Sequence, residues 1–151
     1  MDKELLPIYQ RAIGLLASRE HSRLQLFRKL TDKGFAGEQV DAVLSQLAQQ
    51  NLQSDERFTE SFIHSRIIRG QGPVRIHAEL RERGCSDELI AAYLDFSDPS
   101  WRRQVEEVRC KRFGRELPED YQTRAKQARF LQYRGFTPEQ IRCALNQSEF
   151  D

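Results

Sequence analysis

The stretch R-I-I-R-G-Q-G-P-V-R-I-H-A-E-L-R-E-R-G, from Arg66 to Gly84, predicts two helices joined by a tight turn. Gly70 ends the first helix, and Pro73 takes the first position of the second, where a missing amide hydrogen does no harm. Ile76 and Leu80 lie one helical turn apart and form the buried side of the second helix, which several arginines surround. The centre of the chain is therefore expected to be a basic helix-turn-helix element.

The end of this stretch recurs elsewhere in the chain. Arg83-Gly84 has counterparts in Lys33-Gly34 and Arg134-Gly135, at intervals of 50 and 51 residues between the glycines. A leucine stands four residues before each glycine, and aliphatic residues stand six and ten residues after it. The positions twelve residues before the glycines hold good N-cap residues, namely Ser22, Gly72 and Thr123. This agreement at many offsets indicates three tandem repeats.

Helical signals continue on both sides of the central stretch. Apolar residues recur at three- and four-residue steps from Glu4 to Arg19, and capping signals at Ser22, Ser54 and Thr137 start further helices. We expect an all-α chain of about nine helices. Since a unit of about 50 residues buries little surface, neighbouring repeats should pack in series, in an elongated array that can curve. The expected three-helix repeats span residues 1–52, 53–97 and 98–151.

Composition excludes several classes of protein. The chain has 151 residues, of which 38% are hydrophobic and 31% charged, and no apolar run approaches the roughly 20 residues of a membrane span. The N-terminal sequence M-D-K-E-L-L-P lacks the pattern of a secretory signal. We therefore expect a cytoplasmic protein that binds no membrane, and a monomer, because its apolar content suffices for internal packing.

The chain also lacks the usual signals of a metal site or an enzyme. Three widely spaced cysteines and three histidines show no ligand spacing, so the cysteines are interpreted as small apolar core residues. The segment G-Q-G-P at 70–73 lacks the Lys-Ser/Thr of a phosphate-binding loop. No pairing of a nucleophile with a base stands out. We expect no metal, no cofactor and no enzymatic activity.

Basic residues are the strongest candidates for a binding function. The formal net charge is only +1, but from His64 to Arg134 fifteen Lys and Arg stand against eleven Asp and Glu. For any single arginine, a solvated helix face balanced by a nearby glutamate is an equally good interpretation. The aromatic residues Trp101, Phe113, Tyr121, Phe130 and Tyr133 are expected in the core or at helix ends rather than as base-stacking platforms. The candidate basic residues are Arg66, Arg69, Arg75, Arg81, Arg102, Arg109, Lys111, Arg112, Arg124, Lys126, Arg129 and Arg134.

Three segments resemble the RecX family, the regulators of the bacterial recombinase RecA. D-E-R-F-T-E-S-F-I-H-S-R-I-I-R-G-Q-G-P-V-R-I-H-A-E-L-R-E-R-G, from Asp55 to Gly84, is similar to the central signature of that family. R-A-K-Q-A-R-F-L-Q-Y-R-G-F, from Arg124 to Phe136, resembles its C-terminal signature, and the segment from His21 to Phe35 resembles its N-terminal repeat. Cys85 departs from the aliphatic residue expected at its position.

The resemblance implies a helical repeat protein that binds RecA–DNA filaments. It implies inhibition of filament extension and of the ATPase, strand-exchange and co-protease activities of RecA, and so a role in recombination, DNA repair and the SOS response. Contact with single- or double-stranded DNA through the backbone is compatible with the basic faces. The alternatives are a stand-alone helical DNA-binding module and an interaction scaffold for another protein.

Overall fold

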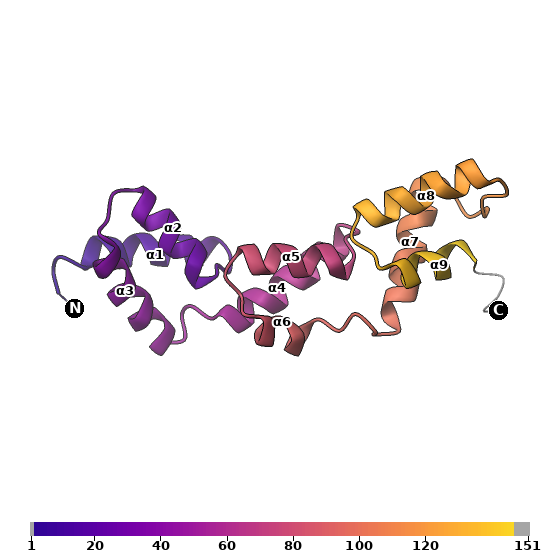
Figure 1. Ribbon diagram of the computed structural model, residues 1–151. Helices are drawn as coiled ribbons and strands as arrows, with labels where there is room; N and C mark the ends of the chain where they lie inside the picture. The colour runs from indigo at the N-terminus through magenta and orange to yellow at the C-terminus, as the bar shows by residue number, and fades with distance from the viewer. Residues whose placement is uncertain (1, 147–151) are drawn as a thin grey trace. The chain divides into compact units, whose positions relative to one another are not determined.

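The computed structural model of the protein describes residues 2–146 (Figure 1). Over this range the chain forms nine α-helices and no β-strand, so the expected all-α class is confirmed. None of these helices is long and apolar enough to cross a membrane. The helices are α1 (Leu6–Ser18), α2 (Arg23–Asp32), α3 (Gly37–Gln49), α4 (Asp55–Ile68), α5 (Pro73–Glu82), α6 (Asp87–Tyr93), α7 (Ser100–Phe113), α8 (Tyr121–Tyr133) and α9 (Pro138–Leu145).

Contacts divide the described chain into two compact units. The first unit contains the residues up to Phe62 together with Leu80–Ile90, and the second contains Ile63–Glu79 and the residues from Ala91 onward. Helices α4, α5 and α6 thus contribute residues to both units. The repeat boundaries stay a sequence-based prediction, because packing units and repeats are different divisions of the chain.

Local capping explains where several helices begin. Ser22 and Thr137 each form a complete capping box with the glutamine three residues later, as their spacing predicts. The prediction that Thr123 caps α8 is wrong. The carboxylate of Asp120 accepts a hydrogen bond from the Thr123 amide at 2.7 Å, so α8 begins at Tyr121. An acidic oxygen placed in the preceding loop is a good N-cap and extends the helix toward that loop.

The core of the first unit lies between α1, α2 and α3. Ile8 and Ala12 of α1, Leu26 and Leu30 of α2 and four residues of α3 form one fully buried cluster. They recur at three- and four-residue steps, which places each set on one helical face. The hydrophobic spacing of the first repeat therefore predicts its core correctly.

The core of the second unit gathers where α7 packs against α8 and α9. Trp101 is 5% exposed and meets the Phe136 ring edge-on, with 6.4 Å between the ring centroids. Leu131 of α8 is fully buried in this unit. Tyr121 and Tyr133 are the first and last residues of α8, so the expectation that they lie in the core or at helix ends is confirmed for the helix ends. They are 84% and 75% exposed and do not belong to the core. Leu131 occupies the inner face of α8, which leaves both tyrosines on other faces.

A similar docking contact occurs once within each unit. In the first unit the Ser22 hydroxyl, at the start of α2, donates a hydrogen bond to the Arg83 carbonyl at 2.7 Å. Gly84 adopts a φ of +87° beside Leu24, and a Cβ atom at position 84 would lie 2.7 Å from the Leu24 Cβ. Glycine is therefore required here both for its backbone conformation and for the close approach of α2.

The second unit repeats this arrangement at the start of α5. The Gly72 and Val74 amides donate hydrogen bonds to the carbonyls of Arg134 and Gly135, at 2.8 and 2.9 Å. A Cβ atom on Gly135 would lie 2.7 Å from the backbone nitrogen of Arg75. In both units, the start of the second helix of one repeat contacts the glycine turn that follows the second helix of the next repeat. In the second unit, this docking satisfies two amide groups at the start of α5 that a helix N-terminus leaves without intrahelical partners.

Candidate functional site

Arg109 does not belong to a basic surface, and its inclusion among the exposed basic candidates is wrong. Its side chain is fully buried, and its Nη2 donates to Glu106 Oε1 at 3.0 Å. The guanidinium also donates to the carbonyls of residues 114–116, at 3.3 to 3.4 Å. A buried charge requires such partners, so Arg109 holds the loop after α7 in place.

Glu79 balances two further candidates. Arg66 Nε and Arg75 Nε each lie 3.0 Å from one of its two carboxylate oxygens. Arg81, in the first unit, forms an exposed ion pair with Asp87 at 3.2 Å. The interpretation that nearby acids balance some of the arginines is therefore correct for these three.

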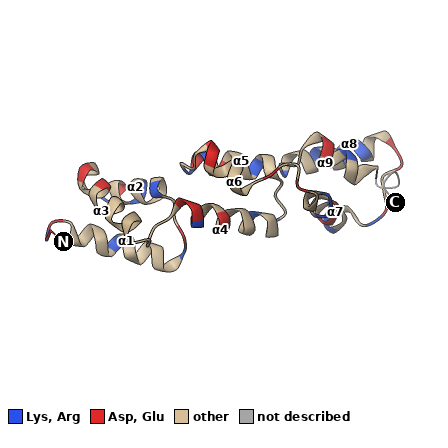
Figure 2. Ribbon diagram, turned by 90° about the horizontal axis from the view of Figure 1, so that it is seen from below, with Lys and Arg blue, Asp and Glu red and all other residues tan. Residues whose placement is uncertain are grey.

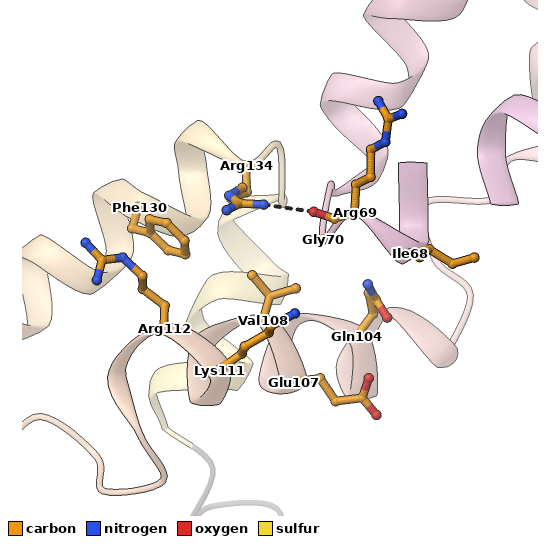
Figure 3. A pocket seen from close by; sticks show the side chains of 10 residues that line it. All are labelled: Ile68, Arg69, Gly70, Gln104, Glu107, Val108, Lys111, Arg112, Phe130 and Arg134. Atoms are coloured by element: carbon orange, nitrogen blue, oxygen red, sulfur yellow. Dashed lines mark hydrogen bonds between the residues drawn. The ribbon is translucent and has the colours of Figure 1, made fainter. Parts of the chain in front are cut away.

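Four other candidates line a pocket in the second unit, which we name the Phe130 pocket (Figure 3). Its volume is about 400 Å³, and it lies among the end of α4, one face of α7 and the second half of α8. The Gly70 turn follows α4 with a φ of +85° and borders the pocket. The lining residues are Ile68, Arg69, Gly70, Gln104, Glu107, Val108, Lys111, Arg112, Phe130 and Arg134.

The ring of Phe130 orders two arginines at this pocket. The guanidinium carbons of Arg112 and Arg134 lie 5.7 and 5.1 Å from the ring centroid, one from α7 and one from the end of α8. Arg134 is fixed further, because its Nη1 donates to the Arg69 carbonyl at 2.9 Å. Cation–π contacts and this hydrogen bond restrict the rotamers of both side chains, which lowers the entropy lost when they bind a ligand.

The directions of the side chains decide the charge of the pocket. In Figure 3 the Arg69 side chain points away from Phe130, so its carbonyl rather than its guanidinium borders the pocket. Glu107, the acidic residue of the lining, also points outward. Lys111, Arg112 and Arg134 remain as the cations around an apolar floor that includes Val108. Such an arrangement favours an anionic group, because Arg forks match phosphate and carboxylate oxygens.

The remaining candidates lie outside this pocket. Lys126 and Arg129 are exposed on α8, where the basic residues are blue in Figure 2. Arg124 is half-buried on the same helix, and Arg102 is exposed near the start of α7. The structure thus brings Lys111, Arg112 and Arg134 together and leaves these four at other positions.

The apolar part of the site was not predicted from the sequence. Phe130 was expected in the core or at a helix end, whereas its ring supports the arginines of the pocket. Its four-residue spacing from Arg134 on α8 is a signal that was available, since such pairs are neighbours on a helix. The contribution of Arg112 from α7 depends on tertiary packing and has no local signal.

The thiols of Cys85 and Cys110 carry no sign of reactivity. Cys85 is buried, with its sulfur 3.4 Å from the Thr59 hydroxyl oxygen, and burial raises its pKa. Burial and a hydrogen bond to Glu106 also raise the pKa of Cys110. Raised values disfavour the thiolate, which is the form that attacks or binds metals. Within residues 2–146, no three His, Cys, Asp or Glu side chains gather in a group able to hold a metal ion.

Solved structures with this fold are known. The crystal structure of RecX from Lactobacillus salivarius superposes with a TM-score of 0.82, covers 100% of both chains and is 16% identical. A second structure, of regulatory protein RecX, gives a TM-score of 0.79 at 20% identity and covers 95% of this chain and 73% of that one. At these identities the likeness concerns the fold.

Sequence comparisons are more specific. Models of the first, second and third three-helix domains of RecX match residues 9–47, 54–94 and 103–145. "Regulatory protein RecX" of Halorhodospira halophila is 44% identical over 140 residues, which are 93% of this chain and 87% of that protein. The protein of the same name from Pseudomonas fluorescens (strain SBW25) is 40% identical, over 97% of this chain and 95% of its own. With three domains in order and this identity over most of its length, the chain belongs to the RecX family of regulatory proteins.

Proposed function

We propose that this protein binds RecA–DNA filaments and inhibits their extension. Inhibition would lower the ATPase, strand-exchange and co-protease activities of RecA and so modulate recombination, DNA repair and the SOS response. The observation that carries the proposal is the 44% identity, over 93% of the chain, to a protein named Regulatory protein RecX. The proposed form is a cytoplasmic monomer without enzymatic activity or cofactor.

The Phe130 pocket is the proposed point of contact with an anionic group of the filament. Two of its three cations, Arg112 and Arg134, contact the Phe130 ring, and no carboxylate of the described residues forms an ion pair with either. The other repeats would add weaker contacts along several RecA protomers. Several linked contacts raise the overall affinity without any single strong site, because each later contact forms within the complex.

Charge reversal at the pocket tests this placement. Lys111→Glu combined with Arg112→Glu removes two of its cations, and both residues are exposed. Lys3→Glu combined with Arg11→Glu makes the same change of charge at two exposed positions outside the pocket. We expect the pocket variant to need at least tenfold more protein for half-inhibition of the DNA-dependent ATPase of RecA, whereas the control should match the parent.

Circular dichroism must show parental helicity for both variants, since the comparison concerns binding. Equal potency of the pocket variant and the parent would remove the pocket from the proposed interface. The stand-alone DNA-binding alternative predicts another pattern: inhibition would disappear with excess DNA and weaken steeply with salt, because phosphate contacts release counterions.

A further inference from the structure

The outer face of α8 carries an exposed aromatic ring that is supported from one side. Tyr133 is 75% exposed, and the Arg75 guanidinium carbon lies 5.5 Å from its ring centroid. Arg75 is itself anchored, because its Nε lies 3.0 Å from Glu79 Oε1. Glu79 thus positions Arg75, and Arg75 contacts Tyr133. These contacts hold the ring in place and leave much of its surface exposed to solvent. An ordered exposed ring loses little entropy when a flat partner stacks on it.

Two cations share this face of α8. Lys126 and Arg129 precede Tyr133 by seven and four residues, and these spacings place all three on one side of the helix. With a rise of 1.5 Å per residue, Tyr133 lies about 6 Å along the axis from Arg129 and about 10.5 Å from Lys126. Both are exposed, and no carboxylate of the described residues forms an ion pair with either.

This combination distinguishes between anionic partners. The face of an aromatic ring is electronegative, so it disfavours a carboxylate of an acidic protein surface and accepts the flat face of a nucleobase. In a duplex the base faces are stacked and hidden, whereas in a single strand they are accessible. Aromatic platforms beside cations that follow the backbone are the usual means of binding single strands without sequence preference.

We propose that Tyr133 is a stacking platform for an unpaired nucleobase, with Lys126 and Arg129 binding phosphates of the same strand. The stack would run from the base through Tyr133 to Arg75. This site rests on the proposed function, which it deepens by naming unpaired DNA as one component that the protein contacts. It also predicts a preference for single strands over duplexes that backbone contacts alone would not give.

Binding to a short fluorescent oligothymidylate, measured by anisotropy without RecA, tests the site. Base stacking on an aromatic side chain is worth about 1–3 kcal/mol per base, so Tyr133→Ala should weaken binding by about 5- to 150-fold. Tyr133→Phe keeps a ring and should bind within about threefold of the parent. The matched control is Tyr121→Ala, which removes a tyrosine of α8 that is 84% exposed and lies on another face.

An abasic strand of equal length separates stacking from charge. The parent and Tyr133→Ala should bind this strand equally, and Lys126→Gln with Arg129→Gln should lower the salt dependence on the normal strand by about 1.4 in the log–log slope. Equal binding of the normal strand by Tyr133→Ala and the parent would overturn the proposal. So would an equal loss on both strands.

Inhibition of RecA, assayed in parallel, distinguishes this proposal from the proposed function. If Tyr133→Ala inhibits RecA less but binds the oligonucleotide like the parent, the face contacts protein and the stacking site is refuted. If the parent binds the oligonucleotide through Tyr133 but never inhibits RecA, the proposed function fails while the stacking site stands.

Discussion

Gly84 and Gly34 occupy equivalent repeat positions within the same unit, and only one of them docks against another helix. Their φ angles are +87° and +99°, so alanine at either position enters a conformation that L residues avoid. At Gly84 a Cβ would lie 2.7 Å from the Leu24 Cβ, whereas at Gly34 no atom lies within 4 Å. The difference between Gly84→Ala and Gly34→Ala therefore isolates the docking of α2 on the Gly84 turn.

The expected loss in the free energy of unfolding has three contributions. Both substitutions should lose about 1–2 kcal/mol through backbone strain. Gly84→Ala must also relieve the overlap with Leu24, and overpacking of this kind costs typically about 1–3 kcal/mol. If α2 instead moves away from the Gly84 turn, the 2.7 Å hydrogen bond from Ser22 to Arg83 is lost, which lowers the free energy of unfolding by about 0.5–1.5 kcal/mol. We expect Gly84→Ala to be less stable than Gly34→Ala by about 1–3 kcal/mol.

Thermal unfolding followed by far-ultraviolet circular dichroism measures the difference. For a unit of roughly 60–100 residues, each kcal/mol lowers the midpoint by about 4–8 °C, so the two variants should be clearly separated. Ser22→Ala removes the same hydrogen bond without adding a Cβ at position 84, and it also removes the cap of α2, so it should lower the midpoint for both reasons. Equal midpoints for Gly84→Ala and Gly34→Ala would refute the docking of α2 on this turn.

Two further predictions concern buried ionisable groups. Arg109→Ala should destabilise the second unit by about 3–5 kcal/mol because it leaves Glu106 and loop carbonyls without their buried partner, while exposed Arg103→Ala should stay within about 0.5 kcal/mol of the parent. Urea unfolding followed by the fluorescence of Trp101, the only tryptophan, measures both, and a parental midpoint for Arg109→Ala would contradict its buried role. Burial lowers the pKa of His21, so the unfolded chain binds more protons below about pH 6.5, and stability should fall as the pH drops through that range. His21→Gln should flatten this fall in urea titrations at several pH values, and an unchanged slope would exclude His21 as its source.

Local chemistry explains which parts of the fold were predictable. The capping boxes at Ser22 and Thr137 need residues only three positions apart, and both form as expected. The start of α8 was misplaced because the repeat spacing drew attention to Thr123, while the loop before it supplies Asp120 as a cap. A cap depends on local geometry and not on the period of a repeat.

The function of individual charged and aromatic residues was harder to predict. Arg109 looks like its exposed neighbours in the sequence, but the loop after α7 folds over it and encloses its charge. As a large aromatic residue, Tyr133 was expected in the core or at a helix end, yet its side chain is exposed to solvent and contacts Arg75. Both outcomes depend on tertiary contacts between separate segments of the chain, which a short sequence pattern does not reveal.

The role of the repeated glycines was predicted in part. Their position at helix ends follows from the sequence, and Gly34, Gly84 and Gly135 all have positive φ angles. Docking of the preceding repeat on Gly84 and Gly135 could not be inferred, because it requires knowing which surfaces meet. The same holds for the Phe130 pocket, where α7 and α8 bring Lys111 and Arg134 together.

The most direct measurement is the single-stranded-DNA-dependent ATP hydrolysis of RecA, with this protein titrated in at moderate salt and with a control containing excess DNA. Inhibition well below one molecule per RecA protomer that survives the excess DNA is the predicted result, because a regulator of filament extension acts on filaments rather than on free DNA. Unchanged hydrolysis, or inhibition that excess DNA abolishes, would contradict the proposed function.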